Sequence, residues 1–176
     1  MVIHMKKNII MFLTVIFCFC LQSTLFRTLN FGGIGPNLLI IVTAVFGFMN
    51  GKKIGTVIGF ICGFLVDIFF GSVLGFYALI YMYIGFINGM FHKIFYPEDI
   101  KLPLTLIGVS DAVYGLTTYF LLFLLRSRFQ FPFYFMHVIL PEIVYTIVIT
   151  IFLYPVILVI NKHFVEEEKR SAKKFV

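Results

Sequence analysis

The sequence predicts an all-α, polytopic integral membrane protein, a bundle of six transmembrane helices with both termini in the cytoplasm. Of its 176 residues, 61% are hydrophobic and only 12% are charged, and the mean hydropathy is +1.04. This composition lies far outside the range of soluble domains. Six apolar segments approach the roughly 20 helical residues that cross a hydrocarbon core of about 30 Å. Lysines and arginines gather at alternate connections, which sets the orientation of the bundle.

The six predicted spans form a single transmembrane domain over residues 1–176, without a soluble catalytic unit. The first span follows a basic start and resembles a signal peptide, but its long apolar stretch and the lack of a small-residue cleavage site favour an uncleaved helix. The second and third spans are short enough to suggest tilt. The predicted spans are residues 8–26, 36–50, 54–70, 74–91, 104–125 and 134–160, followed by a cytoplasmic tail at 161–176.

The distribution of basic residues predicts that both termini are cytoplasmic, because cytoplasmic flanks carry the excess of lysine and arginine. Only Arg27, Arg126 and Arg128 fall on the outer side. An odd number of spans would separate the lysines of the two ends, so the pattern independently favours six. The net charge of +6 indicates no nucleic-acid partner, since the basic residues do not share a face with aromatic side chains. The inner residues are Lys6, Lys7, Lys52, Lys53, Lys93, Lys101, Lys162, Lys169, Arg170, Lys173 and Lys174.

Small residues recur at helical spacing in the third, fourth and fifth spans. In lipid such stripes are packing surfaces, because small side chains let helix backbones approach closely. We therefore expect the three stripes to face one another. They consist of Gly55, Gly59, Gly63 and Asp67 in the third span, Ala78, Tyr81, Gly85, Asn88 and Gly89 in the fourth, and Gly108, Asp111, Gly115 and Thr118 in the fifth.

Three acidic residues lie within predicted spans: Asp67, Asp111 and Glu142. A charged aspartate at a span centre costs about 2.5–3.5 kcal/mol, so such groups face protein or water, or are protonated. One interpretation is a ligand, proton or partner site; the other is a carboxyl that bonds a neighbouring helix, with Tyr114 and Tyr145 as possible donors. Helix rise places Asp67 roughly 5 Å from the outer end of its helix, Glu142 roughly 12 Å in from outside, and Asp111 roughly 10 Å from the inner end. This stagger argues against one metal-binding clamp and leaves a loose ladder open.

The sequence predicts no catalytic, cofactor or metal site. Ser110 and His137 resemble the pair of an intramembrane serine protease, but helix rise separates them by about 14 Å along the membrane normal. Cys18, Cys20 and Cys62 lie in apolar segments without CxxC spacing, as small apolar side chains do.

The stretch GFLVDIFFGSVLG, residues 63–75, is expected to form the outer corner of a helical hairpin. Gly71 suits the residue after a helix end, and Ser72 suits the cap of the next helix. Asp67 lies one turn before this corner, where depth lowers its cost. We expect it to fix the hairpin.

The second to sixth spans resemble the MreD family of bacterial rod-shape-determining membrane proteins. The resemblance rests on Pro36 and Asn37 opening the second span, the glycine-spaced third span with Asp67, and then Gly71, Gly75 and Ala78. It continues with GVSDAVYG around Asp111 and LPEIVYT in the sixth span and covers roughly residues 36–160. Within LPEIVYT, Glu142 is not a position associated with the family. The candidate structural or partner-binding residues are Pro36, Asn37, Gly55, Gly59, Gly63, Asp67, Gly71, Gly75, Gly108, Asp111, Gly115 and Glu142.

The resemblance implies a non-enzymatic scaffold in the bacterial cytoplasmic (inner) membrane that helps build lateral peptidoglycan. Its implied partners are MreC, the synthase RodA with its partner transpeptidase, and MreB. Two alternatives remain. A substrate-binding subunit of energy-coupling-factor vitamin transporters is also a six-helix protein, but its usual alanine stripe is missing from residues 8–26. Proton coupling through the three carboxyls would suit a small carrier, though no internal repeat supports it.

Overall fold

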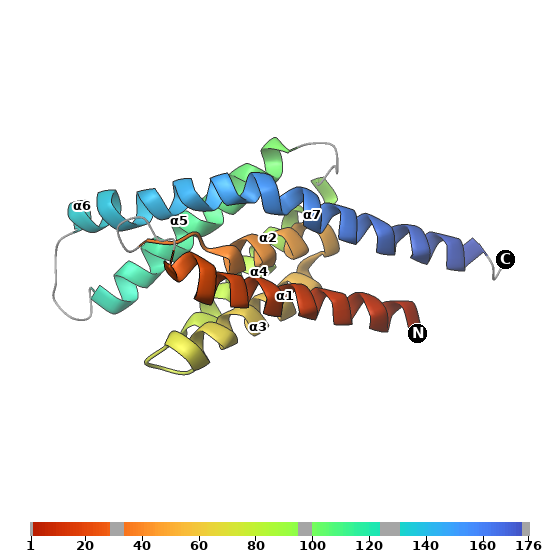
Figure 1. The fold of residues 1–176 in the computed structure, drawn as a ribbon, viewed down its shortest axis with the longest axis horizontal. Coiled ribbons are helices and arrows are strands. Elements are labelled where there is room, and N and C mark those ends of the chain that lie inside the picture. Colours follow the sequence, from red (N-terminus) through yellow and green to blue (C-terminus); the bar gives the residue numbers. More distant parts are fainter. Residues whose placement is uncertain (1, 29–33, 95–99, 124–130, 174–176) are drawn as a thin grey trace.

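The computed structural model describes residues 2–28, 34–94, 100–123 and 131–173. These parts of the chain are 92% helical and contain no strand, which confirms the all-α prediction. Each predicted segment corresponds to a helical rod (Figure 1). The elements are α1 (Val2–Thr28), α2 (Leu38–Asn50), α3 (Lys52–Phe70), α4 (Phe76–Met90), the 3₁₀ turn η1 (Phe91–Ile94), α5 (Lys101–Phe123), α6 (Phe131–Tyr134), the π-helical turn η3 (Phe135–Ile139) and α7 (Leu140–Lys173).

Four stretches of the described chain are long and apolar enough to cross a membrane: Lys6–Thr24, Lys52–Phe70, Lys101–Leu121 and Phe131–His163. The helices α2 and α4 are shorter, with 13 and 15 residues. The third segment begins at Lys52, two residues before the predicted start, and its 19 residues suffice to span. The count of six spans therefore stays a prediction, because only four stretches of the described chain are long and apolar enough to cross a membrane by themselves.

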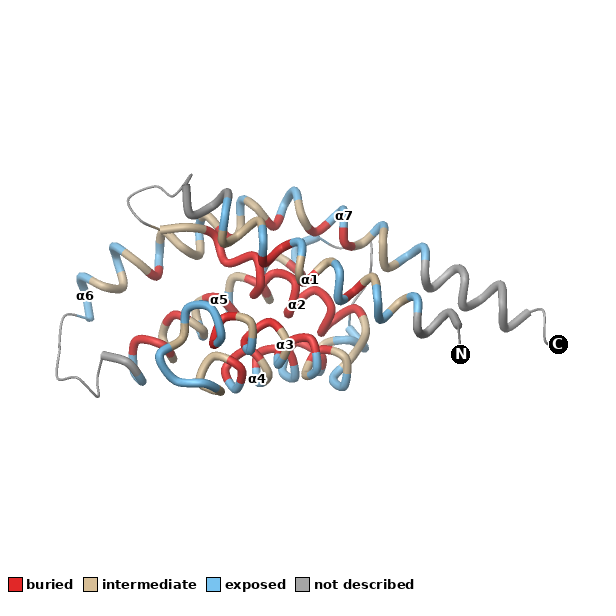
Figure 2. Tube along the Cα trace, turned by 60° about the horizontal axis from the view of Figure 1, so that its bottom comes forward, coloured by how far each residue is buried: buried red, intermediate tan, exposed pale blue. Residues whose placement is uncertain are grey.

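The short helix α2 occupies the centre of the bundle. All twelve residues from Leu38 to Met49 are buried, as expected of a helix that is apolar on every side. The helices α3, α4, α5, α1 and α7 all contact it, and the tube view shows its buried trace enclosed by neighbours (Figure 2). A helix surrounded by protein needs no lipid-facing surface, so α2 can be shorter than a helix that crosses the membrane in contact with lipid.

The N-terminal end of α1 and the C-terminal end of α7 lie at the same end of the molecule (Figures 1 and 2). At the opposite end lie the end of α5 and the start of α6, which flank residues 124–130 (Figure 1). Arg126, Arg128 and Lys174 lie outside the described residues. This placement of the chain ends matches an even number of passes.

The glycine stripes of α3 and α4 face each other at backbone contact distance. A methyl group added at Gly63 would come within 2.6 Å of the Ala78 Cα, and one at Gly89 within 2.5 Å of the Lys52 Cα. Added methyls at Gly55 and Gly59 would strike the carbonyl oxygens of Gly85 and Tyr81. Only glycine permits this approach, which confirms that these two stripes pack together.

The prediction that the α5 stripe packs against the stripes of α3 and α4 is wrong for the two α5 glycines, Gly108 and Gly115. An added methyl at Gly108 would meet the Ile147 side chain at 3.3 Å, and one at Gly115 would meet Ile139 at 3.1 Å. Both partners belong to the α6–α7 rod. The fifth stripe therefore packs against the last rod, and side chains separate the two backbones.

The last rod runs without interruption from Phe131 to Lys173, so residues 161–173, predicted as a tail, continue the helix. A π-helical turn at Phe135–Ile139 precedes Pro141, and the Leu140 amide bonds the Phe135 carbonyl. Proline lacks the amide that a regular helix would use here, and neighbouring turns adjust to that loss. The turn shifts the register of the rod immediately before Glu142.

Candidate polar site in the bundle core

Asn37 is the centre of a buried hydrogen-bond network at the start of α2. Its side-chain oxygen accepts a hydrogen bond from the Ile40 amide at 3.2 Å and from the Tyr81 hydroxyl at 2.9 Å. Its backbone amide donates to the Thr146 hydroxyl at 3.1 Å, and its side-chain amide donates to Glu142 at 3.5 Å. One side chain thus caps α2 and ties it to both α4 and α7.

Asp111 lies next to this network but takes no part in its hydrogen bonds. The side chain is 2% exposed, and neither carboxylate oxygen has a hydrogen-bond partner within the described residues. The Thr146 hydroxyl lies beside it and accepts the Asn37 amide, and a hydroxyl that accepts one hydrogen bond can still donate its own hydrogen. A buried carboxyl without partners is costly unless something neutralises it.

Glu142 brings a second carboxyl to the same place. It precedes Thr146 by one helical turn, so the two share a face of α7, and its charge would act directly on Asp111. Tyr114 also lies close to both carboxyls, with its ring edge-on to Tyr81 at 5.3 Å between centroids. The depth estimate from the sequence kept these two carboxyls apart, but in the structure they are close enough for their charges to act on each other.

Asp67 lies elsewhere and is fully engaged. Its two carboxylate oxygens accept the backbone amides of Gly75, Tyr77 and Ala78 at 2.9–3.0 Å. These are free amides of the first turn of α4, where a negative charge also interacts favourably with the helix dipole. Asp67 therefore caps the next helix from the end of α3.

Gly71 directly follows the last residue of α3, as expected, and its amide bonds the carbonyls of Val66 and Asp67, whereas the capping role expected of Ser72 is wrong. Gly71 has an extended backbone with φ of −80° instead of a left-handed one. The residue before α4 is Gly75, with φ of +94°, a conformation that favours glycine. Asp67 supplies the cap that was assigned to Ser72, because a carboxylate reaches three amides at once.

A second polar contact lies one residue from Asp111. The Asn88 side-chain amide donates to the Ser110 hydroxyl at 2.7 Å, and Ser110 donates to the Leu106 carbonyl at 2.7 Å. His137 is exposed, stacks on Phe133 at 4.2 Å and contacts the Phe133 carbonyl through Nδ1. Since Ser110 bonds to Asn88 and not to His137, the protease-like arrangement is not formed.

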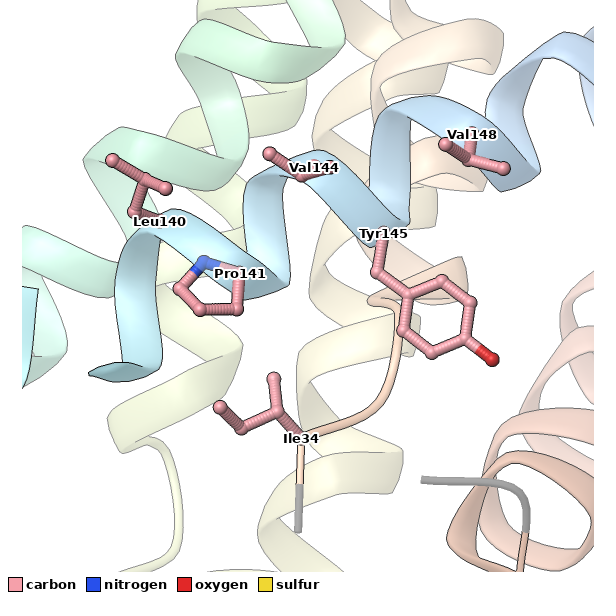
Figure 3. Close-up of a pocket in the computed structure, with 6 residues that line it drawn as sticks. All are labelled: Ile34, Leu140, Pro141, Val144, Tyr145 and Val148. Atoms are coloured by element: carbon pink, nitrogen blue, oxygen red, sulfur yellow. The ribbon is translucent and has the colours of Figure 1, made fainter. Parts of the chain in front are cut away.

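Sequence reasoning missed Thr146 and the bonding role of Tyr81. Thr146 could have been found by its spacing, since it follows Glu142 by four residues on a predicted helix. Tyr145, named as a possible donor, lines an outer groove of about 440 Å³ (Figure 3). The groove is lined by Ile34, Leu140, Pro141, Val144, Tyr145 and Val148.

The free cysteines Cys18 and Cys62 are buried and Cys20 is exposed. No group of three or more histidine, cysteine, aspartate or glutamate side chains suited to a metal occurs within the described parts of the chain.

Comparison of the sequence with models of known families gives a match over most of the chain. A model of the family described as rod shape-determining protein MreD matches residues 4–163. The chain belongs to the MreD family. No curated protein and no solved structure matches it. The family match covers α1 through most of the last rod, so Asn37, Asp67, Asp111 and Glu142 all lie within the MreD region.

Membership fixes the broad role of the protein. MreD proteins are rod-shape-determining membrane proteins that belong to the MreBCD system, a family not known for enzymatic activity. The apolar helices of this chain are consistent with that membrane role.

Proposed function

We propose that this protein is a non-enzymatic, six-span scaffold of the rod complex in the bacterial cytoplasmic membrane, which binds MreC and thereby helps direct lateral peptidoglycan synthesis. The observation that carries the proposal is the family match over residues 4–163. RodA, its partner transpeptidase and MreB would join the same complex. Within it, Asp67 and the glycines of α3 and α4 hold the bundle that partners recognise.

The surface of the bundle supports helix binding. Grooves run along both sides of α5, one of about 280 Å³ against α4 and one of about 440 Å³ against α7. Gly108 and Ala112 line the second groove, and small residues of this kind favour close helix contact in lipid. A single transmembrane helix of MreC would fit along such a groove.

Co-purification from detergent tests the partner. The wild type co-expressed with MreC is expected to elute as a complex, and Ala112→Phe, which fills the α5–α7 groove, is expected to lose it. Val159→Phe is the matched control, because Val159 is 67% exposed and lines neither groove beside α5. A wild-type chain that fails to retain MreC, or that leaves cell width unchanged when depleted, would contradict the proposal.

Reporter fusions test the topology. Reporters active only in the cytoplasm are expected to work at both termini and at Gly51, and to fail between Gly71 and Gly75. The lysines that begin α3 and α5 lie on the expected cytoplasmic side. Termini on opposite sides of the membrane would exclude six spans, and two periplasmic termini would contradict the expected orientation.

The transporter-subunit alternative receives no support from the comparisons, since no solved structure matches the chain. Equilibrium binding with a panel of vitamins separates it from the scaffold. A vitamin that binds tightly and specifically would favour the transporter subunit over the scaffold.

A further inference from the structure

The buried polar residues of the bundle include acids but no bases. Among the side chains that the structure describes, the buried polar or charged set is Asn37, Thr43, Asp67, Asn88, Ser110, Asp111, Thr118, Thr146 and Thr150. No lysine, arginine or histidine appears in it. The Asp111 and Glu142 carboxyls therefore share one cluster without a protein cation to balance them.

The groups around the pair are neutral at ordinary pH. Cys62 of α3, Tyr77 and Tyr81 of α4, Tyr114 of α5 and Tyr134 of α6 lie within electrostatic reach of the cluster. From α2 the neighbours are the side chains of Asn37 and Thr43, which do not titrate, and α1 adds Cys18 near Cys62. None of these supplies a positive charge, so the negative charges of the pair have no compensation from the chain.

The two buried aspartates differ in how their carboxylate oxygens are bonded. Both Asp67 oxygens accept backbone amides, whereas both Asp111 oxygens, at 2% exposure, accept nothing. The unbonded oxygens lie on the side of the Thr146 hydroxyl and Glu142. A buried carboxylate and a partly buried one are costly side by side without compensation, because desolvation penalises the buried charge and the two charges repel each other.

We propose that Asp111 and Glu142 form a binding site for a small monovalent cation, a proton or a sodium ion, in the core of the bundle. The Thr146 hydroxyl provides a neutral oxygen beside the two carboxyls, and oxygen ligands are those that hard cations prefer. The Asn37 side chain faces Glu142 with its amide nitrogen, so it orients that carboxyl and is not itself a ligand. Glu142 is only partly buried, so it is the group by which a cation enters. Occupancy of the site would link α5, α7 and the start of α2.

The test is thermal unfolding of the purified full chain in detergent, with the probes being sodium chloride and pH. A cation that binds the folded state raises the melting temperature. For sodium, the melting temperature in mildly alkaline buffer is expected to rise by several degrees in sodium chloride relative to choline chloride. If the bound cation is a proton, sodium chloride is expected to leave the melting temperature unchanged. In sodium-free buffer the melting temperature then rises as pH falls, because the folded state binds more protons than the unfolded one.

Three variants test whether the sodium or pH dependence of the melting temperature arises at Asp111 and Glu142. Asp111→Asn keeps the shape of the side chain and removes its charge, so it is expected to abolish the dependence while remaining folded. Glu142→Gln should do the same, and Asp67→Asn, a carboxyl outside the cluster, should retain the wild-type dependence. Infrared detection of a protonated carboxyl that disappears in Asp111→Asn or Glu142→Gln would identify the proton.

A wild type whose melting temperature ignores both sodium and pH would overturn the proposal. So would an Asp111→Asn variant that keeps the full wild-type dependence. These measurements use the protein without MreC, so their outcome is independent of the scaffold proposal.

Discussion

The α3–α4 hairpin and the α5–α7 pair solve the burial of an aspartate in opposite ways. In the hairpin, Asp67 accepts three backbone amides and the two helices touch through glycines. In the α5–α7 pair, Asp111 accepts none, and side chains such as Ile147 separate the backbones. Both aspartates are 2% exposed.

The difference teaches that burial of a charged residue type does not reveal its role. Asp67 completes the backbone bonding of a helix start, so its contribution is to folding. Neither carboxylate oxygen of Asp111 accepts a hydrogen bond from the described residues, so both remain able to bind another group. The hairpin is expected to be sensitive to small changes of shape, and the α5–α7 pair to changes of solution composition.

The largest expected effect is the difference between adding one methyl group at the α3–α4 interface and adding one at the α5–α7 interface. Gly59→Ala would force its Cβ into the Tyr81 carbonyl, which cannot move aside, and is expected to destabilise the protein by about 3 kcal/mol or more. Gly108→Ala meets only the end of the Ile147 side chain at 3.3 Å and is expected to change stability by less than about 1 kcal/mol. Thermal unfolding in detergent measures both. Equal losses would show that the interfaces are packed alike.

Removal of the two carboxyls is expected to give the next largest contrast. Asp67→Ala loses three hydrogen bonds to helix amides and should cost about 2–4 kcal/mol. Asp67→Asn keeps one acceptor and should fall between that variant and the wild type. Asp111→Asn loses no hydrogen bond and is expected to be at least as stable as the wild type in mildly alkaline buffer without sodium. An Asp111→Asn loss as large as that of Asp67→Ala would remove the distinction between the two regions.

Asn37 connects the two regions, and its replacement is expected to have an intermediate effect. Asn37→Ala removes the acceptor for Ile40 and Tyr81, and should cost about 2 kcal/mol. Tyr81→Phe removes one of these bonds and should cost about 1 kcal/mol. Chemical unfolding of both single variants and the double variant measures their coupling. Strictly additive losses would contradict a shared network.

The smallest expected effect concerns the turn of the hairpin. Gly75 has φ of +94°, but an added methyl would meet no atom within 4 Å. Gly75→Ala therefore introduces backbone strain without a clash and should cost about 1 kcal/mol. A loss comparable to that of Gly59→Ala would show that the turn is packed more tightly than its surroundings indicate.

Much of the helical framework could be predicted from the sequence. Apolar length gave the six helical segments, and glycine spacing gave the α3–α4 contact, because both are local patterns that depend on helix periodicity alone. Asn37 was placed correctly at the start of α2 by the resemblance to the MreD family.

The polar core could not be predicted in the same way. The meeting of Asp111 with Glu142 depends on how α5 and α7 pack against each other, which no periodicity encodes. Asp67 was assigned to the hairpin correctly in position, but its three amide partners follow from the path of residues 71–75. The α5 stripe was assigned to the wrong neighbour, since spacing shows which face is small and not what packs on it.

The hydrogen bond between Asn37 and Thr146 spans 109 positions of the chain, and this has a consequence for biosynthesis. The start of α2 emerges from the ribosome long before Thr146 is made. At 5–20 residues per second, roughly 5–20 s separate the two events. During that interval the nascent protein holds an uncovered polar helix start within the membrane. A chaperone or insertase that shields this surface would act in that window, and a chain truncated before Thr146 would remain its client.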